Sequence, residues 1–183
     1  MSARDALLDA YEAILLDDGV RAATLEAVAA RAGVSKGGLL YHFPSKDALV
    51  AGLVARLEAL AAEDRDRMRQ APEGAVRYYI RTSNWSGSSL DRALVATSQL
   101  AQESDVAARD VVARIGQEWL ELIVEQIGDR AISRAILLIG DGLYYNAALT
   151  GGTYNTLTGE QSLEELLEVV DHLVELAGAR RAS

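Results

Sequence analysis

Apolar residues recur at three- and four-residue spacing along most of the chain, and no stretch alternates with period two for long. Such spacing is typical of amphipathic α-helices. Pro44 and Pro72 are the two prolines, while alanine, leucine and glutamate, which favour helices, are abundant. The pattern predicts an all-α protein of about nine helices.

Four helices are predicted before Pro72. Their ranges are 3–16, 25–32, 36–43 and a long segment after residue 45, whose apolar stripe Leu49, Leu53, Leu57 and Leu60 then fades into charged residues. Thr24, Ser35 and Ser45 are suited to cap the second, third and fourth helices. Gly33 supplies the positive φ that ends the second helix.

Five further helices are predicted in the rest of the chain. Pro72 is expected to open the fifth helix, because proline is favoured in the first helical turn. The sixth covers 90–102, the seventh runs from 104 or 105 to 128, the eighth covers 132–149 and the ninth covers 162–177. Ser162 is expected to cap the ninth helix, with Glu165 at the capping-box position.

The second and third predicted helices, with a glycine-containing turn between them, form a helix-turn-helix. In this unit the second helix enters the major groove of DNA with its N-terminal residues nearest the base edges. Gly37 and Gly38 leave that end uncluttered, although each costs about 1 kcal/mol of helix stability relative to alanine. A purely structural helix has little reason to contain both, so the pattern indicates DNA binding.

The charge pattern is locally consistent with this role. The net charge of −9 by itself argues against nucleic acid. Residues 27–46 nevertheless contain no acidic side chain, while Arg31, Lys36 and Lys46 supply three cations and His42 a further candidate. The sequence therefore predicts a small basic face on an acidic body.

Composition excludes several other classes of protein. The chain has no cysteine, which excludes disulfides and thiol chemistry. With only His42 and His172, neither a histidine metal cluster nor a Ser-His-Asp site is expected. The longest apolar stretch, 131–149, contains Arg134 and Asp141, so a buried helix is expected rather than a membrane span. The acidic first helix argues against a signal peptide, and the cytoplasm is expected.

The segment from about Arg4 to Val54, which contains "LLDAYEAILLDDGVRAATLEAVAARAGVSKGGLLYHFPSKDALV", resembles the N-terminal domain of the TetR family of bacterial transcriptional regulators. It carries the sub-motif "GVSKGxLxxHFxxKxxL". This resemblance implies a homodimeric repressor that binds a palindromic double-stranded DNA operator and is released by a small molecule. It implies a DNA-binding domain at 1–47 and a helical effector-binding and dimerisation domain at 48–183. No cofactor is expected.

The resemblance also implies roles for individual residues. Positions that touch the DNA backbone in the family are matched by Thr24, Ser35, Lys36, Tyr41, His42 and Lys46, and positions near base edges by Gly37, Gly38 and Leu39. Helical spacing favours core packing over base contact for Leu39, and His42 could pack beside Phe43. The family often has tyrosine at the position of Leu40, which here could instead pack internally or contact a thymine methyl group.

The remaining predictions concern the C-terminal part. The helices near 132–149 and 162–177 have wider apolar surfaces than one core face needs, which favours a homodimer interface over an internal hairpin. Candidate effector contacts are Tyr78, Arg81, Trp85, Trp119, Asp141 and Tyr145, for which core packing is the alternative. Two alternative functions are left open: a regulator that responds to a protein partner, and a helical enzyme.

Overall fold

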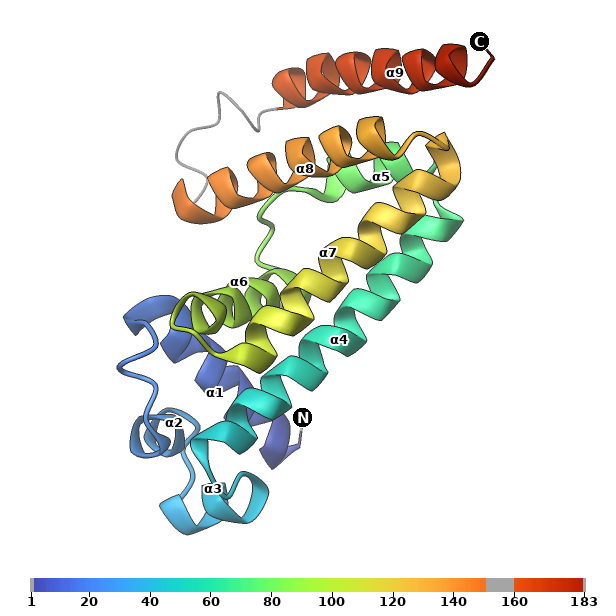
Figure 1. Cartoon of the computed structure of the whole chain (residues 1–183). Coiled ribbons are helices and arrows are strands. Elements are labelled where there is room, and N and C mark those ends of the chain that lie inside the picture. Colours follow the sequence, from blue (N-terminus) through green and yellow to red (C-terminus); the bar gives the residue numbers. More distant parts are fainter. Residues whose placement is uncertain (1, 151–159, 183) are drawn as a thin grey trace. The chain divides into compact units, whose positions relative to one another are not determined.

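The computed structural model describes residues 2–150 and 160–182, and every regular element within these ranges is an α-helix (Figure 1). The elements are α1 (Ala3–Asp18), α2 (Leu25–Arg31), α3 (Lys36–His42), α4 (Lys46–Gln70), α5 (Ala75–Thr82), α6 (Ser89–Gln102), α7 (Val106–Ile127), α8 (Arg130–Thr150) and α9 (Glu160–Ala182). The all-α prediction is confirmed, with nine helices in the described ranges. None of the described helices combines the length and the apolar character needed to cross a membrane.

Short side chains fix where the N-terminal helices begin. Thr24, Ser35 and Ser45 each accept a hydrogen bond, at 3.1 Å, from the backbone N–H three residues further along. Gly19 and Gly33 follow α1 and α2 with φ angles of 81° and 69°. Glycine adopts this left-handed region without the steric penalty of a side chain, so both helices can end in tight turns.

The start of α5 differs from the prediction. The helix begins at Ala75 rather than at Pro72. The side chain of Gln126, on α7, accepts a hydrogen bond from the backbone N–H of Val76 at 2.9 Å and so satisfies one of the free donors of the first turn. This cap comes from a residue 50 positions away, which explains why the local sequence did not locate the helix start.

Two other predicted features are also corrected. α9 begins at Glu160, so Ser162 lies inside the helix instead of capping it. The apolar stripe of α4 does not fade after Leu60, because Ala61, Asp64 and Met68 are all buried. These three positions continue the three- and four-residue spacing of the stripe, and one of them is a carboxylate.

The helices form two compact units. The first unit contains Met1–Ala61 and Gly87–Ile115, and the second contains Ala62–Ser86 and Gly116–Ser183. α4 and α7 therefore each contribute residues to both units. This division does not show which residues bind DNA, so the boundary at residue 47 between a DNA-binding domain and an effector-binding domain stays a prediction.

In the first unit, α1 packs against both α2 and α6. Leu7, Leu8, Leu39 and Leu53 are among its fully buried side chains. The guanidinium group of Arg56, on α4, donates hydrogen bonds of 2.6 Å to Asp9 and 2.9 Å to Glu12 on α1. Burial raises the pKa of Glu12, while its hydrogen bond from Arg56 acts in the opposite direction. This ion pair joins α1 to α4 within the unit.

In the second unit, α8 lies against α5 and α9 (Figure 1). Met68, Ile80, Ile123, Ile136 and Val170 contribute buried side chains from α4, α5, α7, α8 and α9 to one apolar cluster. A glycine permits the close approach of α5 and α8, because a Cβ atom at residue 140 would lie 2.3 Å from a ring carbon of residue 79.

Candidate nucleic-acid interface and ligand site

α2 and α3 are short helices of seven residues each, and they are in contact with one another. Their connection is fixed by a hydrogen bond of 3.0 Å from the backbone N–H of Val34 to the carbonyl of Ala29. Val28 and Leu39 are fully buried, one from each helix. This geometry is that of a helix-turn-helix, as the sequence predicted.

One face of α3 is exposed. It consists of Lys36, Gly37, Leu40 and Tyr41, of which Tyr41 is 85% exposed and Leu40 is 37% exposed. A Cβ atom placed on Gly37 would have no neighbour closer than the hydroxyl oxygen of Ser35, at 3.9 Å. The glycine is therefore not required by packing within the described chain.

Leu39 lies differently from the expectation that it approaches base edges. Its side chain is fully buried in the first unit, so it supports α3 from within. The exposed leucine of the helix is its neighbour Leu40. Because successive helical residues point about 100° apart, only one of the two can face the core.

The other predicted backbone contacts surround α3. Thr24 and Ser35 are exposed helix caps. His42 is half-buried, and its ring meets that of Tyr41 edge-on at 5.0 Å. The ammonium group of Lys46 is exposed and donates a long hydrogen bond of 3.4 Å to the carbonyl of residue 20. These side chains are available to an external partner.

Acidic side chains from outside residues 27–46 neutralise part of the predicted basic face. The Lys36 ammonium lies 2.6 Å from the carboxylate of Glu26. Arg31 pairs with Asp17 and, at 3.5 Å, with Asp18. Residues 27–46 contain no acidic side chain, but folding places these three carboxylates next to the cations of that segment.

A second candidate site lies in the second unit, where aromatic side chains surround a buried carboxylate. Asp64 accepts hydrogen bonds from the Tyr78 hydroxyl at 2.9 Å and from the Trp119 indole nitrogen at 3.1 Å. Tyr79 donates to the carboxylate of Asp141 at 2.9 Å, and its ring lies 6.1 Å from that of Trp119. We call these five residues the aromatic–carboxylate cluster.

The electrostatics of this cluster follow from burial. Burial, aided by the hydrogen bond to Asp64, raises the pKa of Tyr78 to about 12. Burial also raises the pKa of Asp141, whereas the hydrogen bond from Tyr79 acts to lower it. The hydrogen bonds described above to the two carboxylates come from neutral tyrosine and tryptophan side chains. The guanidinium group of Arg67 also acts on Tyr78 and opposes the rise of its pKa. Two carboxylates with neutral donors would favour a ligand that carries hydrogen-bond donors or positive charge.

The structure brings together only some of the predicted effector contacts. Tyr78, Trp119 and Asp141 are in the cluster, whereas Arg81 is exposed and pairs with Glu164 of α9 at 3.0 Å. Trp85 is half-buried in the segment between α5 and α6, and Tyr145 is 39% exposed on α8.

Asp64 and Tyr79 were missed by the sequence analysis. Asp64 lies seven residues after Leu57 and three after Ala61, so its position on the buried face of α4 was a detectable signal.

α8 carries an exposed stripe of small and apolar side chains. The stripe consists of Ala131, Ala135, Leu138, Gly142 and Tyr145, alternately four and three residues apart. Leu138 is 61% exposed, and a Cβ atom on Gly142 would meet nothing within 4 Å. This is the spacing of a helix that packs along another helix. We call it the α8 stripe.

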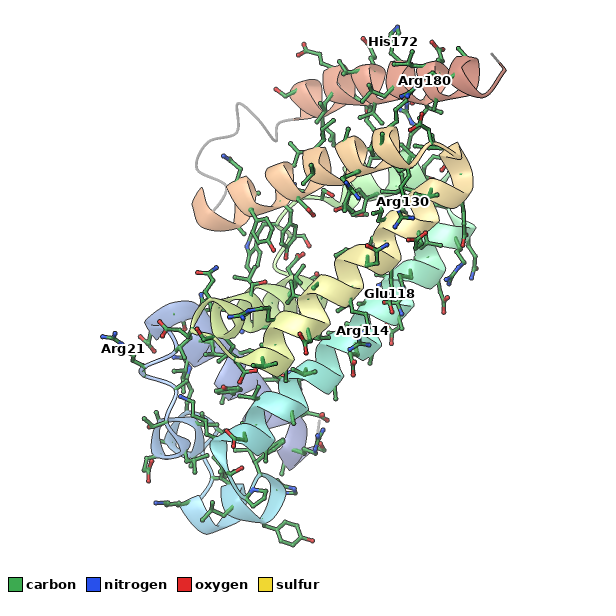
Figure 2. All side chains as sticks on the ribbon, in the orientation of Figure 1. Arg21, Arg114, Glu118, Arg130, His172 and Arg180 are labelled. Carbon is green, nitrogen blue, oxygen red and sulfur yellow. The ribbon has the colours of Figure 1, made fainter. Side chains whose placement is uncertain are left out.

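α9 has a related surface. Val169 and Leu176 are 53% and 51% exposed. Their spacing places them on the face that also carries His172, which in Figure 2 lies on the side of α9 away from α8. By contrast, Leu166 and Leu173 are half-buried against the core of their own unit.

Solved structures share this fold over nearly the whole chain. The multidrug binding protein EbrR, crystallised with malachite green, is 22% identical with a TM-score of 0.67, covering 93% of this chain and 96% of that one. NalD, the secondary repressor of the MexAB-OprM multidrug efflux pump in Pseudomonas aeruginosa, is 23% identical with a TM-score of 0.63, covering 93% and 95%. A TetR transcription regulator from Haloarcula marismortui is 18% identical with a TM-score of 0.65, covering 95% and 97%. No curated protein matches the chain.

A helix-turn-helix followed by further helices is typical of DNA-binding transcriptional regulators. Residues 7–53 match the family described as "Bacterial regulatory proteins, tetR family". The match covers the N-terminal part of the chain, where the resemblance to the TetR family seen in the sequence is thereby confirmed. The matched family is one of bacterial regulatory proteins, and NalD and the Haloarcula marismortui protein are described as a repressor and a transcription regulator.

Proposed function

We propose that the protein is a repressor that binds a palindromic DNA operator as a homodimer and is released by a small molecule. The observation that carries the DNA-binding part is the exposed face of α3, where Gly37 is open to the outside and needed by no internal contact. A glycine at such a position lets the helix backbone approach base edges closely. Action on bacterial DNA implies a location in the cytoplasm.

Gly37→Ala tests this proposal because stability and binding should change in opposite directions. Alanine favours the helix by up to about 1 kcal/mol, so the variant should be slightly more stable. The added methyl group lies on the proposed contact face, so affinity for the operator should fall at least about tenfold. The operator is first selected from a random duplex library, and binding is then followed by fluorescence anisotropy.

Gly116→Ala provides the matched control. Gly116 lies in the middle of α7, and a Cβ atom there would meet nothing within 4 Å. This variant should gain similar stability while its affinity for DNA stays unchanged. Wild-type affinity in Gly37→Ala would contradict the assignment of α3 as the helix that contacts bases.

The homodimer is supported by the α8 stripe together with Val169 and Leu176 of α9. Exposed apolar surface of this extent on two helices is typical of a protein interface. A two-fold dimer presents two copies of α3, which explains why we expect a palindromic operator whose half-sites lie about 34 Å apart, or a multiple of this distance.

The aromatic–carboxylate cluster supports a small-molecule effector. A few convergent polar groups among aromatic side chains are typical of a ligand site. EbrR was crystallised with malachite green, which makes this dye a practical first probe. A protein partner in place of the small molecule is the alternative, and it would be favoured if no compound from a chemically broad library released operator DNA.

A further inference from the structure

The cations of the DNA-binding surface are held by acidic residues that precede them in the chain. Lys36 is the first residue of α3, and its ammonium group donates a hydrogen bond of 2.6 Å to the carboxylate of Glu26, in the first turn of α2. Arg31, the last residue of α2, pairs with Asp17 and Asp18 near the end of α1. In the folded chain, these two cations therefore form ion pairs with three carboxylates.

The pair between Lys36 and Glu26 is exposed and exchangeable. The side chain of Lys36 is 58% exposed and that of Glu26 is 65% exposed. Acceptance of the hydrogen bond from Lys36 lowers the pKa of Glu26, so the carboxylate stays ionised at neutral pH. A DNA phosphate that approaches Lys36 therefore has to displace a charged competitor and also meets its negative charge.

Lys46 offers a contrast on the same surface. Its ammonium group donates only to the backbone carbonyl of Val20, at 3.4 Å, and no carboxylate of the described residues forms an ion pair with it. A phosphate can reach this lysine without breaking an ion pair. The two lysines should therefore contribute differently to DNA binding.

We propose that Glu26 limits the affinity of the protein for DNA by competing with the phosphate backbone for Lys36. This inference rests on the proposed contact between α3 and DNA, and it concerns sequence-independent affinity. An acidic competitor weakens binding to every duplex, so stable binding occurs only where base contacts add to it. Because the effect is the same for every duplex, Glu26 lowers the occupancy of non-specific DNA without changing the ratio of operator affinity to non-specific affinity.

The competition predicts an unusual salt dependence. A lysine that binds a phosphate normally releases a counterion, with a slope of log affinity against log salt of about −0.9 per contact. When Lys36 leaves Glu26, the freed carboxylate attracts a cation again, so the net release from this contact is small. Lys46 should contribute about one full counterion per subunit.

Glu26→Gln tests the proposal with random-sequence duplexes, by fluorescence anisotropy over a range of salt concentrations. Affinity should rise roughly threefold per subunit, hence roughly tenfold for a dimer that makes the contact twice, as expected for an exposed ion pair. The salt slope should become steeper by about one per subunit. In a Lys36→Gln background, Glu26→Gln should have a much smaller effect.

Glu103→Gln is the matched control, since it removes the same charge from an exposed side chain at the end of α6, also in the first unit. Equal effects of the two glutamine variants would show that only net charge matters and would overturn the proposal. Weaker binding by Glu26→Gln would overturn it too, because Glu26 would then orient Lys36 toward the phosphate.

The same measurements separate this inference from the proposed function. If Lys36→Gln weakens DNA binding but Glu26→Gln does not strengthen it, the competition is refuted and the DNA contact of α3 stands. If Lys36→Gln, Lys46→Ala and Gly38→Glu all bind duplexes as the wild type does, the proposed role of α3 itself fails.

Discussion

At the scale of single residues, Leu40 is the side chain most suited to direct base contact. Apart from Lys36, the exposed face of α3 carries no side chain that can donate two hydrogen bonds to a base. An exposed leucine can instead contact the methyl group of thymine, which distinguishes T from C in the major groove. We therefore expect each operator half-site to contain a thymine that faces Leu40.

Replacement of this thymine by deoxyuridine, which lacks only the methyl group, tests the contact. The loss should weaken wild-type binding about fourfold per half-site, since a buried methylene group contributes about 0.8 kcal/mol. Leu40→Ala should bind the thymine and deoxyuridine operators almost equally. If Leu40→Ala loses as much affinity as the wild type on this replacement, the thymine methyl is recognised by another residue.

Single residues also show what the sequence could and could not predict. The caps Thr24, Ser35 and Ser45 were predictable because each interaction spans only three positions. The partners of Lys36 and Arg31 were not, since they lie ten or more positions away and depend on how α1, α2 and α3 pack. Interactions between near neighbours in the sequence were therefore enough to predict where the helices begin. The ion pairs of the surface could be found only from the folded structure.

At the scale of elements, the packing of α5 against α8 depends on Gly140. The space next to this glycine is filled by the ring of Tyr79 and the hydroxyl of Ser83, and a Cβ atom would lie 2.7 Å from the latter. Gly142, two residues further along α8, has different surroundings, because a Cβ atom there would meet nothing within 4 Å.

Gly140→Ala should therefore destabilise the second unit although alanine favours helices. Crowding of a packed interface typically costs 1–3 kcal/mol, which exceeds the helix gain of about 1 kcal/mol. Urea unfolding monitored by tryptophan fluorescence measures the difference, with Gly116→Ala as the control that should be stabilised. A stabilised Gly140→Ala variant would show that α5 and α8 are less closely packed than the structure indicates.

At the scale of the whole molecule, the α8 stripe predicts a dimer. Leu138→Glu places a charge at the centre of the stripe without disturbing the core of the subunit, because Leu138 is 61% exposed. Burial of an unpaired charge in the interface is strongly unfavourable, so light scattering should give the mass of one subunit at micromolar concentration. Val106→Glu, at a residue that is 65% exposed on α7, should leave the dimer intact.

Leu166 and Leu173 of α9 are less suitable positions for the same test. Those two side chains are half-buried in their own unit, so a charge there would unfold the subunit as well as separate the dimer. The sequence showed that the helices near 132–149 and 162–177 have more apolar residues than one core face needs. Only the structure shows which of these residues face the core and which are exposed.

Induction is also a property of the whole molecule, because it requires the effector and the operator to influence each other. A ligand can release DNA only if it binds the free protein more tightly than the DNA-bound protein. A coupling of 1–3 kcal/mol would weaken operator binding about 5- to 150-fold, and by linkage the operator must weaken ligand binding by the same factor.

Trp119 provides the signal for this measurement, since its indole nitrogen donates to Asp64 in the aromatic–carboxylate cluster at 3.1 Å. A ligand that enters the cluster should change the intrinsic fluorescence, and a saturating concentration of operator should shift the titration to higher ligand concentration by at least about fivefold. Random-sequence DNA, at a concentration too low to bind, should cause no shift and serves as the control. Identical titrations with and without operator would mean that the ligand does not act as an inducer, because equal affinity for the two states shifts no population, however tightly the ligand binds.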